Sequence, residues 1–215
     1  MNSQLPSKRN YDSSRRKEQA RQTRRQIIAA ARELFIARGY SGATIESIAS
    51  QAGVAVETVY AAFGSKREIL SGLIGISVVG DDEPIPLLQR PGPLAALQEK
   101  NQQRQIQLFA SDMAAIMGRV APLFEVLHSA AKTEPDLAEM LQKILDERLA
   151  GMKVFVNALS ANGPLRAGLT VEQAAETVWA LSSAEVFTLL VTHRGWNADK
   201  YQQWLVNALT NLIIP

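Results

Sequence analysis

The sequence predicts an all-α protein of two domains, in which a small N-terminal three-helix domain precedes a larger helical one. Apolar residues recur at intervals of three and four through most of the chain, as in amphipathic helices, and no segment alternates like a convincing strand. Four prolines within residues 81–93 exclude a continuous helix there. A length of 215 residues with 47% hydrophobic and 20% charged residues is ordinary for a globular protein with a sizeable core.

Composition also excludes several classes of site. The absence of cysteine excludes disulfides, thiolate nucleophiles and zinc sites with cysteine ligands. The two histidines form no metal-binding motif, and signatures such as H-E-x-x-H and the P-loop do not occur. We therefore expect no enzyme, no metal and no cofactor. Because no apolar run reaches about 18 residues and the basic start lacks an apolar signal segment, we expect a cytoplasmic protein with no membrane partner.

Positive charge is concentrated at the N-terminal end. Residues 1–40 contain ten Lys and Arg against three Asp and Glu, a net charge of +7, whereas residues 41–80 carry −1 and residues 81–215 carry −4. Two interpretations are open: a solvated tail, or a cluster of cations that attracts nucleic-acid phosphates. Because residues 1–19 are polar and lack any period, we expect them to form a flexible basic arm.

A first helix is predicted from about residue 21 to residue 37. Its apolar stripe consists of Ile27, Ile28, Ala31, Leu34 and Phe35. Gly39 stands where a helix commonly ends in a left-handed residue, and Tyr40 is expected to pack against the helix. This helix would support the motif that follows it.

A helix-turn-helix is predicted between Thr44 and Lys66. Apolar positions at helical spacing are interrupted once, by Gly53, and then resume. Two helices that cross at about 90–120° need a small residue at their contact and a residue that tolerates positive φ at the turn, and Ala49 and Gly53 meet these needs. Thr44 is placed to cap the first helix, and Ser65 begins an S-x-x-E capping box for the helix after the motif.

The same stretch resembles a known family. The matching residues are Ala37 to Tyr40, Thr44, Ile48, Ala49, Ala52 to Val54, Thr58 to Tyr60, Phe63, Ser65 and Lys66. They resemble, without gaps, the signature of the tetracycline-repressor (TetR) family of bacterial transcription regulators over roughly residues 22–72. The resemblance implies a DNA-binding domain over residues 20–66 and a helical ligand-binding and dimerisation domain over residues 67–215.

The predicted second helix of the motif presents a small set of candidate DNA contacts, with Thr44 beside them. By resemblance, Thr58, Tyr60 and Lys66 contact phosphates, and their hydroxyl and ammonium groups suit that role. Val56 and Glu57 are left as base readers, through a thymine methyl and cytosine N4. An alternative for Glu57 is that it faces solvent beside Arg67. The sequence departs from the family at Ala55, often a capping Ser, and at Glu57, often Gly.

The rest of the chain is predicted to be helical. One helix runs from about residue 65 to residue 79 and ends at Gly80. After the prolines, stripes predict helices over residues 106–120 and 137–159, with a shorter helix from Pro122 to about Lys132 between them. Thr170 with Gln173 opens a helix to about Thr192, and Asn197 caps the last helix.

The helix over residues 170–192 is apolar on more than one side, so every side of it must be covered. A second subunit is the covering surface that we expect, because helix-turn-helix proteins usually read paired half-sites as two-fold dimers. Burial inside one monomer is the alternative. The candidate interface residues are Trp179, Val186, Leu190, Trp204, Leu205 and Leu212.

The middle helices supply candidates for a ligand pocket. Flexible thioethers and aromatic rings suit an adaptable apolar cavity, and they suit an ordinary core equally well. The candidates are Phe109, Met113, Met117, Phe124, His128, Met152 and Phe155. Among these, His128 is a polar exception, and Glu185 is another on the following helices; each is either a ligand contact or a hydrogen-bonded structural residue.

Together with the resemblance, these features predict a homodimeric transcriptional regulator. We expect a repressor that binds a palindromic double-stranded operator and releases it when a small apolar effector enters the C-terminal domain. The alternative is a ligand-free DNA-binding or protein-interaction module on the same scaffold.

Overall fold

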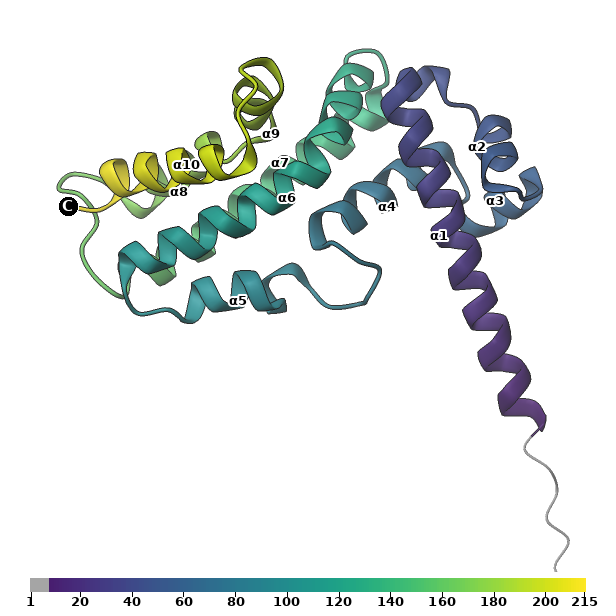
Figure 1. The fold of residues 1–215 in the computed structure, drawn as a ribbon, viewed down its shortest axis with the longest axis horizontal. Helices are drawn as coiled ribbons and strands as arrows, with labels where there is room; N and C mark the ends of the chain where they lie inside the picture. Colours follow the sequence, from purple (N-terminus) through teal and green to yellow (C-terminus); the bar gives the residue numbers. More distant parts are fainter. Residues whose placement is uncertain (1–7) are drawn as a thin grey trace, which may run out of the picture. The chain divides into compact units, whose positions relative to one another are not determined.

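The computed structural model describes residues 8–215, with side chains from residue 15 onward, and this part of the chain contains helices and no strand. It divides into two compact units, the first ending at Leu73 and the second beginning at Ile74. The division falls inside helix α4 (Lys66–Val79). The predicted domain boundary after residue 66 lies at the start of that helix. Figure 1 shows the order of the helices.

The first unit begins with a longer helix than the sequence predicts. Helix α1 runs from Lys8 to Gly42, with a kink at Gly39, whose φ of 69° is left-handed. The prediction of a flexible arm over residues 1–19 is therefore wrong from Lys8 onward, because these residues are helical. Residues 1–7 lie outside the described part of the chain. Arg, Lys, Glu and Gln are good helix formers, and adding turns to an existing helix avoids the cost of nucleation.

Helices α2 (Ile45–Ala52) and α3 (Val56–Phe63) complete the predicted helix-turn-helix. α1 contacts both of them. The predicted stripe of α1 is buried, with Ile27, Ala31 and Phe35 fully enclosed. Ile48 and Val59 supply the facing side chains from α2 and α3. Burying side chains of this size stabilises the unit by about 1.5–3 kcal/mol each.

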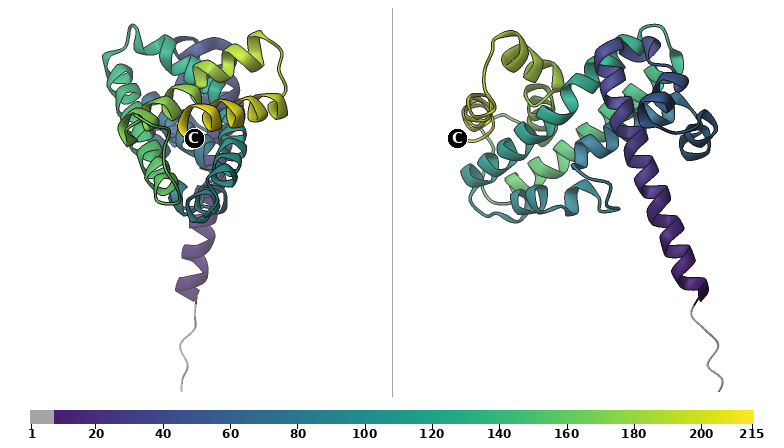
Figure 2. Two further views of the ribbon diagram at one scale, coloured as in Figure 1. Left: turned by 90° about the vertical axis from the view of Figure 1, so that its left-hand side faces the viewer. Right: turned by 45° about the vertical axis from the view of Figure 1, so that its right-hand side comes forward.

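The second unit is built around one long helix. This unit contains the 3₁₀ turn η1 (Leu87–Gln89), a π-helical segment η2 (Thr188–His193) and several α-helices. The α-helices are α5 (Pro91–Gln98), α6 (Gln102–Ala131), α7 (Pro135–Ser160), α8 (Val171–Leu181), α9 (Ala184–Phe187) and α10 (Ala198–Ile213). α6 packs against α5, α7, α9 and α10 (Figure 2). Most of its inward side chains, from Ile106 to Ala130, are buried.

Prolines shape this unit less than the sequence suggests. α5 was not predicted, yet it forms because Pro91 and Pro93 fall in its first turn, where backbone N–H groups have no helical acceptor anyway. The separate helix predicted from Pro122 is also wrong, because α6 continues through this proline. Val120 and Leu123 are fully buried on either side of it, and Gly118, whose carbonyl cannot accept from Pro122, is exposed to water.

The helix predicted over residues 170–192 is broken at Ser182 and Ser183. The Ser182 hydroxyl donates to the Val178 carbonyl (2.7 Å), and the Ser183 hydroxyl caps α9 by accepting from the Val186 amide (3.3 Å). The predicted caps at Thr170 and Asn197 are confirmed. No single described helix is both long and apolar enough to span a membrane; α8 and residues 184–193 reach that composition only as a pair bent by 41°.

Candidate nucleic-acid interface

The turn between α2 and α3 has the predicted geometry. The Thr44 hydroxyl accepts from the Ser47 amide (3.1 Å), and the Ser47 hydroxyl accepts from the Thr44 amide (3.0 Å), which closes a capping box at the start of α2. Gly53 ends α2 in the left-handed region at φ 68°. The Val54 amide then donates back to the Ala49 carbonyl (3.0 Å). These contacts fix the direction in which α3 leaves the turn.

Helix α3 buries one face and exposes the other. Val59 and Phe63 point into the core, with 1% and 9% of their surface exposed. Glu57 is exposed, and Tyr60 is 50% exposed, so both lie on the outward face as expected. Val56 and Thr58 are half-buried beside them. The polar outward groups are therefore a carboxylate and a phenol, next to the Thr58 hydroxyl.

Ala55 stands at the N-cap of α3 and supplies no side-chain hydrogen bond. The first amides of this helix therefore keep their capacity to donate to an external acceptor. A phosphate oxygen is such an acceptor, and the positive end of the helix dipole favours it.

An arginine from α1 holds the far end of α3. The Arg24 guanidinium lies 4.0 Å from the centre of the Phe63 ring and donates to the Ala62 carbonyl. Sequence reasoning counted Arg24 only as one of the N-terminal cations. Its position four residues before the buried Ile28 is the signal that would have placed it next to the apolar face of α1.

Lys66 also makes a contact inside the unit. Its ammonium donates to the Tyr40 carbonyl (2.8 Å) and lies 4.1 Å from the centre of the Tyr40 ring. Tyr40 itself stacks on Phe35 at 5.8 Å, as expected for a residue that packs against the first helix. Lys66 is half-buried, so its position is fixed beside the helix-turn-helix.

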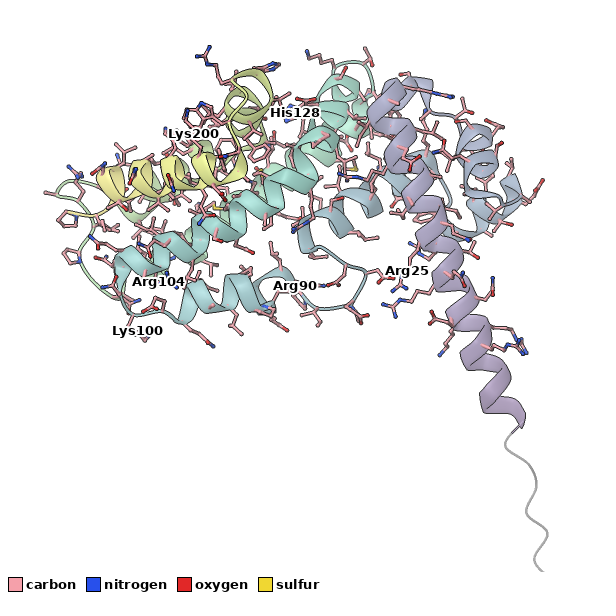
Figure 3. The ribbon with its side chains drawn as sticks, viewed as in Figure 1. Arg25, Arg90, Lys100, Arg104, His128 and Lys200 are labelled. Carbon is pink, nitrogen blue, oxygen red and sulfur yellow. The ribbon has the colours of Figure 1, made fainter. Side chains whose placement is uncertain are left out.

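Charge around the outward face is mixed. Arg67 forms an ion pair with the adjacent Glu68 (3.0 Å) and not with Glu57, so no ion pair supports the alternative in which Glu57 faces solvent beside Arg67. Hydrogen bonds from its own backbone amide and from Thr44 hold the pKa of Glu46 below its ordinary value, which keeps a negative charge at the start of α2. Positive charge comes from α1, where Arg15 and Lys17 are exposed. Arg25 is exposed on the same helix (Figure 3).

The predicted pocket residues of the second unit are packed as a core. All of them except His128 are buried, and the Phe109 and Phe155 rings stack at 4.2 Å. His128 is half-buried, with Nε2 2.9 Å from Glu185 Oε1. A shallow cavity of about 510 Å³ lies elsewhere, between α6 and α10. It is lined by Arg104, Gln107, Leu108, Ser111, Gln202, Gln203, Val206 and Asn207.

The predicted interface residues differ in exposure. Leu212 is 48% exposed, while Trp179, Val186, Leu190 and Trp204 are half-buried. Leu205 is fully buried within its own unit, because α10 turns this side of the helix inward. A buried Leu205 leaves no surface for a partner to cover.

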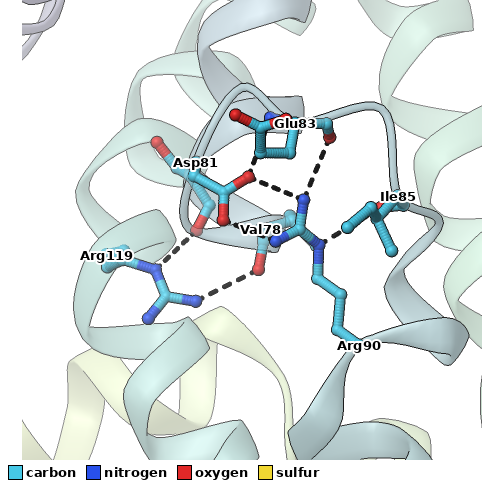
Figure 4. Close-up of polar contacts among 7 residues, drawn as sticks. Val78, Asp81, Glu83, Ile85, Arg90 and Arg119 are labelled. Atoms are coloured by element: carbon cyan, nitrogen blue, oxygen red, sulfur yellow. Dashed lines mark hydrogen bonds and ion pairs between the residues drawn. The ribbon is translucent and has the colours of Figure 1, made fainter.

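Two arginines of the second unit hold the C-terminal end of α4 and the loop that follows it (Figure 4). The Arg119 guanidinium from α6 donates to the carbonyls of Ser77 (2.8 Å) and Val78 (3.1 Å). Arg90 closes the following loop, with two bonds to the Asp81 carboxylate (2.6 and 2.8 Å) and others to backbone carbonyls. Cations at the C-terminal end of a helix are favourable for the last unpaired carbonyls.

Comparison with known proteins matches the N-terminal unit to one family. Residues 27–73 match the family of bacterial regulatory proteins described as the tetR family. Over 173 residues, the chain is 27% identical to the HTH-type transcriptional repressor BepR of Brucella suis biovar 1, covering 78% of this chain and 80% of that protein.

Solved structures are similar over nearly the whole chain. The structure of a SmeT–triclosan complex has a TM-score of 0.66 at 20% identity, covering 90% of this chain and 92% of the other. The regulator FadR from Bacillus subtilis in complex with stearoyl-CoA has a TM-score of 0.64 at 21% identity, covering 86% and 96%. At these identities the likeness shows the fold, a helix-turn-helix unit followed by a helical unit.

Proposed function

Because the chain belongs to the tetR family of bacterial regulatory proteins through its residues 27–73, we propose that it is a ligand-responsive transcriptional repressor that binds a palindromic operator as a homodimer. The observation that carries this proposal is the capped α2, the Gly53 turn and the exposed polar face of α3 within that matching stretch. Such a protein acts on DNA in the cytoplasm and performs no catalysis.

The proposed DNA contacts follow from the exposed groups of the first unit. Tyr60 and Thr58 donate hydroxyl protons to phosphate oxygens, and the uncapped start of α3 donates backbone amides. Glu57 and Val56 face base edges in the major groove. Thr44 fixes α2 and has its hydroxyl at the exposed start of that helix.

Lys66 joins this set in a double role. Its ammonium donates to the Tyr40 carbonyl, and its positive charge beside the helix-turn-helix attracts a phosphate as well. Exposed cations of α1, such as Arg15 and Lys17, add a sequence-independent attraction. The affinity thus depends on the basic helix as well as on α3.

Dimerisation supplies the second half-site. The exposed Leu189 and Leu212, which are 57% and 48% exposed, leave apolar surface on η2 and α10 that a second copy would cover. A two-fold dimer presents two α3 helices to inverted half-sites.

Release of the operator is proposed to run through α4. This helix is covalently continuous from the first unit into the second, and Arg119 of α6 holds its last carbonyls. A small effector that binds the second unit differently in two arrangements of α6 would shift α4. Two structurally similar proteins have been solved in complex with triclosan and with stearoyl-CoA, which supports an effector with a large apolar part.

Paired titrations test this function. Operator fragments selected by the purified protein are titrated by fluorescence anisotropy, with and without apolar compounds that raise its melting temperature. A compound that raises the melting temperature and lowers operator affinity supports the repressor. Tight operator binding that no stabilising compound weakens would favour the ligand-free module instead.

A further inference from the structure

Polar side chains from α7, α9 and α10 interact electrostatically beside the break between α8 and α9. Arg148 comes from α7, and its Nη2 donates to the Trp179 carbonyl and to the Ser182 hydroxyl (3.0 Å). Nε and Nη1 find no acceptor among the described residues. No carboxylate of the described residues lies within ion-pairing distance of this guanidinium either.

The charge of Arg148 persists in this setting. Burial lowers the pKa of its guanidinium to about 10, partly offset by the charge of Glu185, so the group is still cationic at neutral pH. A charge removed from water is costly unless it is paired. The carboxylate that acts on it from α9, Glu185, is instead 2.9 Å from Nε2 of His128.

Tyr201 of α10 adds a second unsatisfied group. Its side chain is fully enclosed, and its hydroxyl has no hydrogen-bond partner. Burial raises the pKa of this phenol, so it stays protonated and keeps a proton to donate. Buried polar groups are nearly always hydrogen-bonded, and an exception calls for an absent partner.

His128 contributes the other unsatisfied buried polar atom of the described side chains. Its Nε2 lies near Glu185 without an aligned hydrogen bond. His128 lies near the end of α6 (Figure 3) and beside the Phe124 ring, with centroids 6.0 Å apart. The Phe187 ring meets Tyr201 edge-on at 4.9 Å. Two aromatic rings thus flank the polar groups.

We propose that Arg148 and Tyr201 form a binding site for the anionic group of an aromatic or aliphatic carboxylate, whose apolar part packs against Phe124 and Phe187. This proposal rests on the proposed ligand-responsive function and gives the effector a chemical class. A carboxylate accepts a charge-assisted hydrogen bond from Nη1 or Nε of a guanidinium and another hydrogen bond from a phenol. It supplies an acceptor for one of the unused N–H groups of Arg148 and for the Tyr201 hydroxyl.

The site also explains how a ligand acts on the fold. Arg148 already holds the end of α8 through the Trp179 carbonyl and Ser182. A carboxylate that joins Arg148 to Tyr201 would tie α7, the α8–α9 break and α10 together. Both α7 and α10 pack against α6, and Arg119 of α6 donates to a carbonyl at the end of α4. A bound anion could therefore affect α4 through α6.

Calorimetric titration of the full chain tests the site. The probes are benzoate, 2-naphthoate and octanoate, each with its uncharged primary amide of nearly the same shape. We expect at least one carboxylate to bind about tenfold or more tightly than its amide, as a charge-assisted pair requires. Arg148→Met should remove this preference, Arg148→Lys should keep part of it, and Tyr201→Phe should weaken the carboxylate several-fold without lowering the melting temperature.

Arg104→Met is the matched control, because it removes an exposed arginine of α6 by the same substitution and should leave the preference intact. Equal binding of every acid and amide by the wild type, or an acid preference that persists in folded Arg148→Met, would overturn the site. Operator affinity is measured on the same preparations. Operator binding without acid preference overturns this inference alone, whereas acid binding without operator binding overturns the proposed function and leaves the site.

Discussion

The Lys66 ammonium donates to the Tyr40 carbonyl at 2.8 Å and lies over the Tyr40 ring, so the end of α1 is joined to the start of α4. These two points enclose the helix-turn-helix in the sequence. Arg24 makes a parallel connection, from α1 to the end of α3 at Phe63. Helix α3 is thus held at its far end by Arg24, which also belongs to the positive charge of the N-terminal unit.

Lys66→Ala should affect folding and DNA binding together. Loss of a charged hydrogen bond and a cation–π contact should lower the free energy of unfolding by about 1 kcal/mol. Loss of a phosphate contact should also reduce the slope of log affinity against log salt by about one. Thermal melts and anisotropy titrations at several salt concentrations measure both effects.

Arg67→Ala is the control for Lys66, because Arg67 is exposed and pairs only with Glu68. Its substitution should leave the melting temperature nearly unchanged. If Lys66→Ala lowers stability without altering the salt slope, then Lys66 is a structural residue and not a phosphate contact.

Glu57→Ala should change which sequences are bound more than how tightly. Removing an exposed carboxylate relaxes the preference at the base pair that it reads, by about 1–3 kcal/mol of discrimination. Tyr60→Phe is the contrasting variant, since a lost phosphate contact should weaken all sequences alike. Sequencing of DNA selected by each variant separates these patterns, and an unchanged preference for Glu57→Ala would remove Glu57 as a base reader.

The parts of this fold that the sequence predicts are those set by local contacts. The Thr44 cap and the Gly53 turn depend on residues within four positions of one another, and both are present. The partners of Lys66 and Arg24 lie 26 and 38 residues away, so no local pattern indicates them. From the sequence alone, Lys66 and Arg24 are indistinguishable from other cations on the protein surface.

The errors in the second unit have a similar origin. Pro122 is a helix breaker by local rules, but buried neighbours on both sides keep α6 continuous. Ser182 and Ser183 give no periodic signal, although the second serine caps α9. The Arg148 and Tyr201 pair was missed because its members come from α7 and α10, which are far apart in the sequence and interact only in the folded unit.

Leu212→Glu should convert a dimer into a monomer that remains folded. Leu212 is 48% exposed on α10, so a carboxylate there costs little in the monomer and much in a covered apolar interface. Leu88→Glu is the control, because Leu88 is also an exposed leucine (37%) but lies on η1, outside the proposed interface. Sedimentation velocity measures the mass of the particle, and circular dichroism shows whether the variant is folded. A Leu212→Glu variant that remains dimeric would place the interface elsewhere.

The Asp81–Arg90 pair should make stability depend on acid pH. Hydrogen bonding by Arg90 lowers the pKa of Asp81 below its ordinary value of 3.8. The stabilisation is therefore fully present above that value and is lost as pH falls through the lower folded-state pKa. Asp81→Asn should lower the melting temperature at pH 7, and the difference from wild type should shrink towards pH 3. A difference that is constant with pH would contradict this.

The most direct measurement of the central claim is selection of random double-stranded DNA by the purified protein, followed by sequencing and by anisotropy titration of the enriched fragments. A homodimer that presents two α3 helices predicts enrichment of two inverted half-sites, bound about 10³-fold or more tightly than random DNA at physiological salt. Retention of DNA with no enriched sequence, or of a single half-site bound by a monomer, would contradict the account.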